Sequence, residues 1–168
     1  TPMAELILRH LSEAGYRPAY LSRGYGRRTK GYRLVAPETD NAKTVGDEAL
    51  QVARKFRQLS VAVCEDRVAG ARQLVAETQP DCIILDDAFQ HRRIGRSVDL
   101  VMIDASRPPW LDNLLPLGRL REPLSSLNRA QLVVVNKVME EDKIRSFQRR
   151  ISGKLVFTRT EAIRLVPF

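Results

Sequence analysis

The sequence lacks several features that would have placed it in a class at once. Its two cysteines show no CxxC or histidine spacing, so we expect inert thiols in a reducing compartment, with neither a disulfide framework nor a zinc site. No run approaches about 18 apolar residues, and the first residues lack the basic-then-apolar order of a secretory signal. The phosphate-cradling motif G-x-x-x-x-G-K-[ST] is also missing. The cysteine pattern and the lack of a long apolar run or a signal argue against a membrane-spanning, secreted or disulfide-stapled chain. The missing motif means that no P-loop is visible in the sequence.

The composition is that of a globular protein with an anionic partner. Of the 168 residues, 43% are apolar and 29% are charged, which is enough for one well-buried domain. The net charge of +8 and a pI of about 10.0 fit nucleic acid, nucleotide phosphates or an anionic lipid surface. Because no RNP-like aromatic motif, zinc-finger spacing or helix-turn-helix accompanies the charge, we expect no specific nucleic-acid partner.

Short apolar runs alternate with helical periodicity along the whole chain. This alternation predicts an α/β fold with a mostly parallel sheet. A segment with four prolines, residues 107–126, interrupts the pattern and is expected to be functional or disordered. The predicted strands are residues 19–21, 61–64, 82–85, 100–103, 132–135 and 155–157, and helices are predicted from residues 2, 47 and 66 and around 144–151.

The most informative segment is Leu85-Asp86-Asp87-Ala88-Phe89-Gln90-His91-Arg92-Arg93. It places two carboxylates directly after a buried strand, where ligands bind in open parallel sheets. Adjacent acids there are costly unless a cation such as Mg²⁺ lies against them. The alternative is that one acid only caps a following helix. Capping explains one acid but not the pair, so we predict a phosphate-handling site.

Other strand ends are predicted to bring polar groups to the same edge. After the first strand, glycines beside Arg23 would let backbone amides approach an anion. Arg67 is either a surface charge or a phosphate clamp, and Asp104 is a modest contributor or a cap. Asp47 opens a helix, for which N-capping is a strong alternative role.

Two further elements leave alternatives open. The pair Arg121-Glu122 lies in the long loop, where it is either solvated or aimed inward by the neighbouring proline. The dipeptide Asn136-Lys137 follows a strand as in GTPases, but Met139 stands where the guanine-binding Asp would be. A GTPase is therefore not expected.

In their order, these motifs resemble the tetraacyldisaccharide 4'-kinase family, the lipid A 4'-kinases of Gram-negative bacteria. The segments that carry the resemblance span almost the whole chain: residues 1–2, 21–27 (Leu-Ser-Arg-Gly-Tyr-Gly-Arg), 45–49 (Val-Gly-Asp-Glu-Ala), 66–71, 85–92, 115–123 (Leu-Pro-Leu-Gly-Arg-Leu-Arg-Glu-Pro) and 133–137. Any one of them is ordinary, but seven in this order are specific.

The resemblance implies a P-loop NTPase-like fold, with helices on both faces of the sheet, and a kinase activity. Such an enzyme uses ATP and Mg²⁺ to phosphorylate the 4'-hydroxyl of an anionic tetraacyl glucosamine disaccharide, at the cytoplasmic face of the inner membrane. The implied site residues fall into four groups: Asp47 and Asp87 in catalysis; Thr1, Gln90 and Arg121 in nucleotide binding; Tyr25, Arg67 and His91 in contacts with substrate or phosphate; and Thr1, Asp87 and Glu122 as metal ligands.

The chain departs from the family pattern at both ends. The Walker A glycines and lysine, an N-terminal membrane helix and a C-terminal domain are absent from it. We therefore expect residues 1–168 to be the soluble core of the nucleotide-binding domain. Because phosphoryl transfer depends on positioning and charge neutralisation, this core should be inactive alone. The alternative is a non-catalytic basic α/β fragment that binds anionic lipid or nucleic acid.

Overall fold

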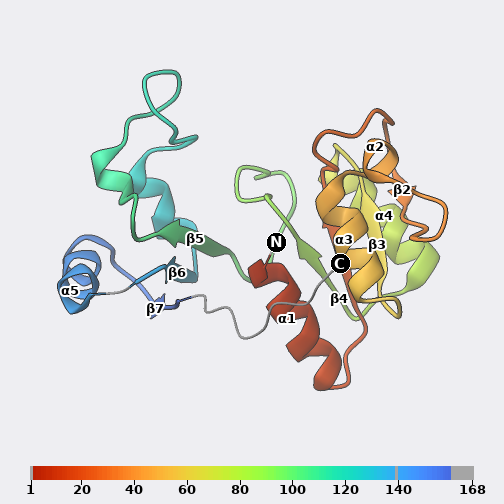
Figure 1. The fold of residues 1–168 in the computed structure, drawn as a ribbon, viewed down its shortest axis with the longest axis horizontal. Helices are drawn as coiled ribbons and strands as arrows, with labels where there is room; N and C mark the ends of the chain where they lie inside the picture. Colours follow the sequence, from red (N-terminus) through yellow and green to blue (C-terminus); the bar gives the residue numbers. More distant parts are fainter. Residues whose placement is uncertain (1, 139, 160–168) are drawn as a thin grey trace, which may run out of the picture. The chain divides into compact units, whose positions relative to one another are not determined.

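The structure is a computed structural model that describes residues 2–138 and 140–159. The chain divides into two compact units, residues 1–95 (unit 1) and residues 96–168 (unit 2). Each unit contains its own sheet (Figure 1) and its own buried apolar core. Each is therefore described by itself.

Unit 1 is built on a four-stranded sheet in the order β2-β3-β1-β4. Its parallel strands are β1 (Pro18–Ser22), β3 (Ser60–Val63) and β4 (Cys82–Leu85), and the short β2 (Arg33–Leu34) runs antiparallel to β3. In the central strand, Tyr20 pairs with Val61 on one side and Ile84 on the other. The parallel strands end at the same edge, which fixes where a site can form.

Helices cover both faces of this sheet. On one face, α1 (Pro2–Glu13) and α3 (Asp47–Lys55) pack against Tyr20 and its neighbours, and on the other α4 (Arg67–Thr78) packs against Leu21. Successive strand residues point to opposite faces, so a central strand with both faces covered is apolar along its length. The remaining helix is the single-turn α2 (Ala42–Val45).

The helix starts follow from local chemistry. The carboxylate of Asp66 accepts hydrogen bonds from the backbone amides of Val68 and Ala69, so Asp66 is the N-cap of α4, at the residue from which this helix is predicted. The N-cap of α3 is Gly46, which has no side chain to offer, and Asp47 is the first helical residue. The predicted alternative in which Asp47 serves as an N-cap is therefore wrong.

Unit 2 contains a three-stranded parallel sheet in the order β5-β6-β7. Its core joins the sheet to α5 through Phe147, which contacts the ring of Trp110 edge-on at 4.7 Å between centroids. The elements are β5 (Leu100–Asp104), the 3₁₀ turns η1 (Pro109–Leu111) and η2 (Leu124–Arg129), β6 (Leu132–Asn136), α5 (Glu141–Arg150) and β7 (Leu155–Phe157).

The predicted α/β class, the parallel strands and the helices on both faces are confirmed in unit 1. The six predicted strands all form, but the described residues arrange them in two sheets rather than one. The short elements β2 and α2 were not predicted. Across residues 2–138 and 140–159, no helix is long and apolar enough to cross a membrane.

Candidate active site

The loops after β1, β3 and β4 meet at the carboxyl edge of the sheet in unit 1. The amide of Cys64 donates to the carbonyl of Ser22 at 3.0 Å, and the amide of Asp86 donates to the carbonyl of Leu21 at 3.1 Å. These hydrogen bonds extend the parallel pairing past the strand ends. The polar segments that follow the three strands consequently lie side by side, as the sequence predicts.

The two adjacent aspartates have different surroundings. One oxygen of Asp86, Oδ2, accepts from the Tyr20 hydroxyl at 2.7 Å, and Oδ1 accepts from the amide of Asp87 at 3.0 Å. Burial, together with the Asp86 carboxylate, raises the pKa of Tyr20 well above its ordinary value, so the phenol stays protonated and keeps donating. Asp86 is thus anchored within the fold.

Asp87, by contrast, is exposed and has an unusual backbone. Its φ of 47° lies in the left-handed region, which is uncommon outside glycine and concentrates at functional sites. No helix starts at either aspartate, because turns follow β4. The alternative that one of these acids caps a helix is therefore wrong.

Arg67 is the most unusual cation of the unit. Its side chain is buried, with 1% of the residue exposed, and no ion pair to it occurs among the described residues. Its Nη1 donates to the Cys64 carbonyl at 2.6 Å and Nη2 approaches the Asp86 carbonyl at 3.5 Å, while its buried Nε has no hydrogen-bond partner. Burial lowers the pKa of Arg67, and the nearby Asp87 opposes that effect. The surface-charge alternative for Arg67 is wrong.

The start of α3 lies against the loop that follows β1. A Cβ added to Gly46 would come 3.0 Å from the Tyr25 carbonyl and 3.1 Å from the Cα of Gly24, so this approach requires glycine. It brings the exposed Asp47 beside Tyr25, whose surface is 84% exposed. Both side chains are therefore open to an incoming substrate.

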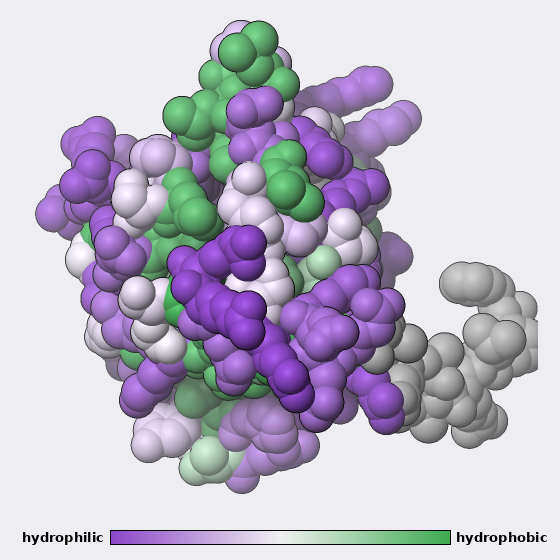
Figure 2. Space-filling model, turned by 90° about the vertical axis from the view of Figure 1, so that its left-hand side faces the viewer, coloured by the Kyte–Doolittle hydropathy of each residue, from purple (hydrophilic) through white to green (hydrophobic). Residues whose placement is uncertain are grey.

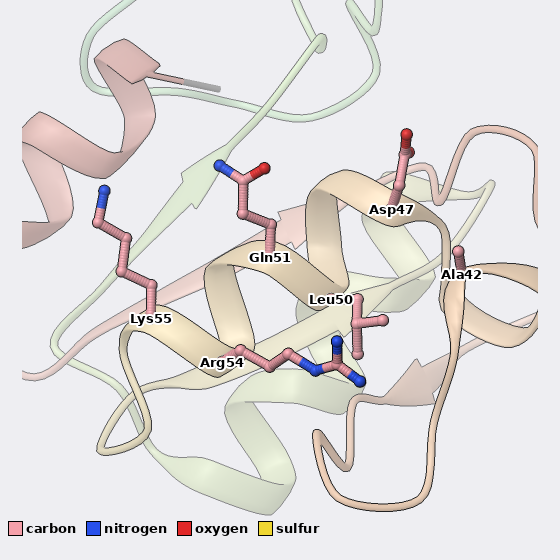
Figure 3. A pocket seen from close by; sticks show the side chains of 6 residues that line it. All are labelled: Ala42, Asp47, Leu50, Gln51, Arg54 and Lys55. Atoms are coloured by element: carbon pink, nitrogen blue, oxygen red, sulfur yellow. The ribbon is translucent and has the colours of Figure 1, made fainter. Parts of the chain in front are cut away.

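Asp47 also borders an open hollow of about 540 Å³ along α3. In Figure 3, Asp47 lies at the N-terminal end of this hollow and Lys55 at its other end, while the side chain of Arg54 turns back toward Leu50. The full lining is Ala42, Asp47, Leu50, Gln51, Arg54 and Lys55. The hollow combines an acid at the helix start with cations two turns away.

The turn after Asp87 contains the exposed Gln90 and the half-buried His91, whose amide donates to the Ala88 carbonyl at 2.9 Å. Hydrogen bonds from two amides of α4 lower the pKa of Asp66, and the charge of Arg93, which closely follows His91, contributes to the same shift. The turn therefore lies near the start of α4 and next to Arg67.

The other predicted residues are placed differently. Thr1 lies outside the described residues. Arg121 and Glu122 belong to unit 2, where Glu122 is not a solvated loop residue: its Oε2 accepts from Nη2 of Arg129 at 2.7 Å. Their roles toward nucleotide and metal stay predictions.

Sequence reasoning overlooked Tyr20, a hydroxyl donor within an apolar strand, whose partner Asp86 is distant in sequence. For Asp104, the sequence predicts only a modest contribution to the site or a capping role. In unit 2, Lys137 donates to Oδ2 of Asp104 at 2.6 Å, and this bond lowers the pKa of Asp104. The polar ends of β5 and β6 are thereby joined by an ion pair.

The predicted Mg²⁺ site offers few protein ligands. Within the part of the chain that the structure describes, no group of three or more acidic, histidine or cysteine side chains is arranged to hold a metal ion. Mg²⁺ in phosphoryl-transfer sites keeps several waters and binds one or two carboxylates together with substrate phosphates. The exposed carboxylate of Asp87 fits that mode.

Comparison with known proteins gives a consistent result. The sequence profile of the family LpxK, tetraacyldisaccharide-1-P 4'-kinase, matches residues 1–165. The chain is similar to the tetraacyldisaccharide 4'-kinase of Chlorobium limicola, with 40% identity over 177 aligned residues that cover 100% of this chain and 51% of that protein. It is also similar to the tetraacyldisaccharide 4'-kinase of Parabacteroides distasonis, with 44% identity over 140 residues, 82% of this chain and 37% of that protein.

Among solved structures, the chain resembles LpxK from Aquifex aeolicus in complex with ATP. The two share 28% identity and superimpose with a TM-score of 0.74, over 92% of this chain and 48% of that one. The chain spans about half the length of the curated relatives it matches.

Proposed function

Because the chain belongs to the tetraacyldisaccharide-1-P 4'-kinase family, we propose that the protein transfers the γ-phosphoryl group of ATP to the 4'-hydroxyl of a tetraacylated glucosamine disaccharide. The similarity to an ATP-bound relative supports the choice of nucleotide. Because the proposed acceptor is acylated, we also propose that the enzyme acts at the cytoplasmic face of the inner membrane. The basic charge of +8 suits both an anionic glycolipid and an anionic membrane surface.

The observation that carries this proposal is the buried guanidinium of Arg67 beside Asp87. A buried charge without a carboxylate partner is costly, and an anion that binds there would offset that cost. Its buried Nε lacks a hydrogen-bond partner, and a local opening of the loops over Arg67 would let this donor reach an oxygen of a phosphoryl group or of the phosphorylated product. Arg67 therefore binds and orients phosphate at the carboxyl edge of the sheet.

Asp47 is the base that accepts the proton of the sugar hydroxyl. Its exposed carboxylate lies at the start of α3, and Tyr25 beside it supplies a flat, open surface for a sugar ring. Proton removal during attack is the usual contribution of a positioned carboxylate in such reactions. Gln90 and His91, in the turn after β4, complete the polar surround of the phosphates.

Asp87 would hold Mg²⁺, with Thr1 and Glu122 as further ligands that the family resemblance implies. The ion would neutralise charge on the phosphates. Asp86 holds the turn that presents Asp87, through its bonds to Tyr20 and to the Asp87 amide. Arg121 would contact the nucleotide.

The test is a kinase assay on the full-length protein with Asp47 changed. Asp47→Asn and Asp47→Ala should each lower kcat by ~10² or more and leave KM for ATP nearly unchanged, because a base acts in the transition state. Asn preserves the shape of Asp and one acceptor oxygen, which can keep the bond from the Glu48 amide, so it separates base chemistry from local structure. Asp81→Asn, at an exposed ion pair with Arg17, is the matched control and should retain full activity. Full activity of Asp47→Asn would overturn the proposal.

A further inference from the structure

Unit 2 displays a cluster of leucines where a water-soluble surface would be polar. Within the segment of residues 111–120, here called the leucine loop, Leu111 is 78% exposed, Leu115 60% and Leu117 87%. Leu114, between them, is also exposed. Single exposed leucines are ordinary, but several within seven residues form a patch that calls for a partner.

The leucine loop projects from the unit as the teal loop that leads from η1 toward η2 in Figure 1. In Figure 2, a group of hydrophobic side chains lies at the top of the view, with hydrophilic ones beside and below it. The leucine loop itself is a projection of unit 2, which suits insertion into a lipid surface.

The loop is held in one shape by its own contacts. The amide of Leu115 donates to the Leu120 carbonyl at 2.9 Å, and the amide of Leu120 donates to the Asn113 carbonyl at 3.0 Å. Asp112 closes the base by accepting from the amide and Nε of Arg119, each at 3.2 Å. Because these bonds already order the backbone, binding costs little further conformational entropy.

The base of the loop is anchored and basic. Trp110, just before it, contacts Phe147 of the unit's core. Exposed arginines flank the leucines at positions 107 and 119, and Asp112 is the one acid between them. Since Asp112 is paired with Arg119, this segment has a net charge of +1 from two arginines and one aspartate.

We propose that the leucine loop is a membrane-surface anchor, which inserts its leucines into the interface of an anionic lipid bilayer. In such an interface, anionic headgroups cover the acyl chains. Inserted leucines at the tip of the loop would reach the acyl chains, and the arginines at its base would lie among the headgroups. A protein partner fits less well, because leucine is under-represented among the residues that dominate protein interfaces. The inference rests on the proposed function only in that an acylated acceptor requires access to a lipid surface.

The first experiment measures sedimentation of the purified 168-residue chain with vesicles. Vesicles of phosphatidylcholine with a third phosphatidylglycerol should retain it, and added salt or removal of phosphatidylglycerol should release it. Leu115→Ser/Leu117→Ser should weaken retention by about a hundredfold, or about tenfold for each leucine withdrawn. Leu34→Ser/Val75→Ser, at exposed apolar positions of unit 1, should leave it unchanged. Equal loss in both double variants would overturn the proposal.

A second measurement locates the loop directly. Leu117→Trp should give a blue-shifted emission with vesicles and be quenched by lipids brominated on their acyl chains, and Val75→Trp should show neither effect. Binding without quenching of Leu117→Trp would assign retention to the basic surface and overturn the proposal. A change in oligomeric state with no lipid retention would identify a second copy as the partner and would also overturn it. No ATP or phosphoryl transfer is measured, so this inference can fail while the proposed kinase activity stands.

Discussion

Replacing Arg67 by methionine should leave the fold intact, or make it more stable, while removing a phosphate-binding group. Methionine keeps an unbranched stem but has no charge and no donors. If Arg67 is present to bind an anion, its burial is a cost that the fold bears for function. If it is present for structure, its removal must be destabilising. The two roles of Arg67 thus predict opposite signs for the change in unfolding free energy.

The expected magnitude follows from the contacts of the guanidinium. The 2.6 Å bond to the Cys64 carbonyl, from a charged donor, is worth about 1.5–3 kcal/mol, and the 3.5 Å approach to the Asp86 carbonyl contributes little. Burial of the charge costs several kcal/mol even after relaxation. The methionine variant should therefore be more stable by about 1–2 kcal/mol. For a chain of this size, each kcal/mol raises Tm by about 2–4 °C.

The assay is thermal unfolding followed by circular dichroism, with and without inorganic phosphate. Phosphate at about 100 times its Kd should stabilise the wild-type chain by about 2.7 kcal/mol and leave Arg67→Met unaffected. Arg72→Met, at an exposed arginine of α4, is the control and should keep the phosphate effect. A loss of more than about 2 kcal/mol in Arg67→Met, with the phosphate effect retained, would refute the reasoning.

Three further changes test the packing and electrostatics of the two units. Gly70→Ala would place a Cβ 2.6 Å from that of Cys64, so it should destabilise unit 1 by about 1–3 kcal/mol in urea unfolding. Phe147→Ala should remove the ring contact with Trp110 and cost about 3–5 kcal/mol, which the shift in tryptophan emission will follow. Burial raises the pKa of Asp40, but hydrogen bonds from Arg33, Ala36 and Thr44 outweigh it and leave the pKa below its ordinary value. Its contribution to stability is therefore complete above about pH 4 and is lost as the pH falls through the lowered pKa, and a pH titration of wild type against Asp40→Asn should show that difference.

Elements whose signal is local were predictable from the sequence. The strands around Leu21, Val63 and Leu85 are apolar runs long enough to be recognised, and the cap at Asp66 is a single-residue signal that acts over the next three amides. The edge at which polar groups meet also follows from chain order, because parallel strands end together. The short β2 and α2 span too few residues to show a hydrophobic periodicity, so the sequence pattern could not predict them.

What could not be predicted depends on contacts between segments far apart in the sequence. The bond from Tyr20 to Asp86 joins two strands, and nothing near either residue indicates it. Sequence alone left Arg67 open between clamp and surface charge, because its burial depends on how α4 packs on the sheet. The leucine loop has no helical or strand period, and its exposed side chains became visible only with the backbone bonds that fix it.

The distribution of aromatic residues over the two units gives the chain a separate optical reporter for each. All four tyrosines, at positions 16, 20, 25 and 32, belong to unit 1, and the single tryptophan, Trp110, belongs to unit 2. Fluorescence excited at wavelengths that only tryptophan absorbs therefore reports the unfolding of unit 2. The tyrosine bands of the near-ultraviolet spectrum report the unfolding of unit 1. Superimposable curves would mean that the units unfold as one cooperative structure, and separated curves would give each unit its own stability, with no label added to the protein.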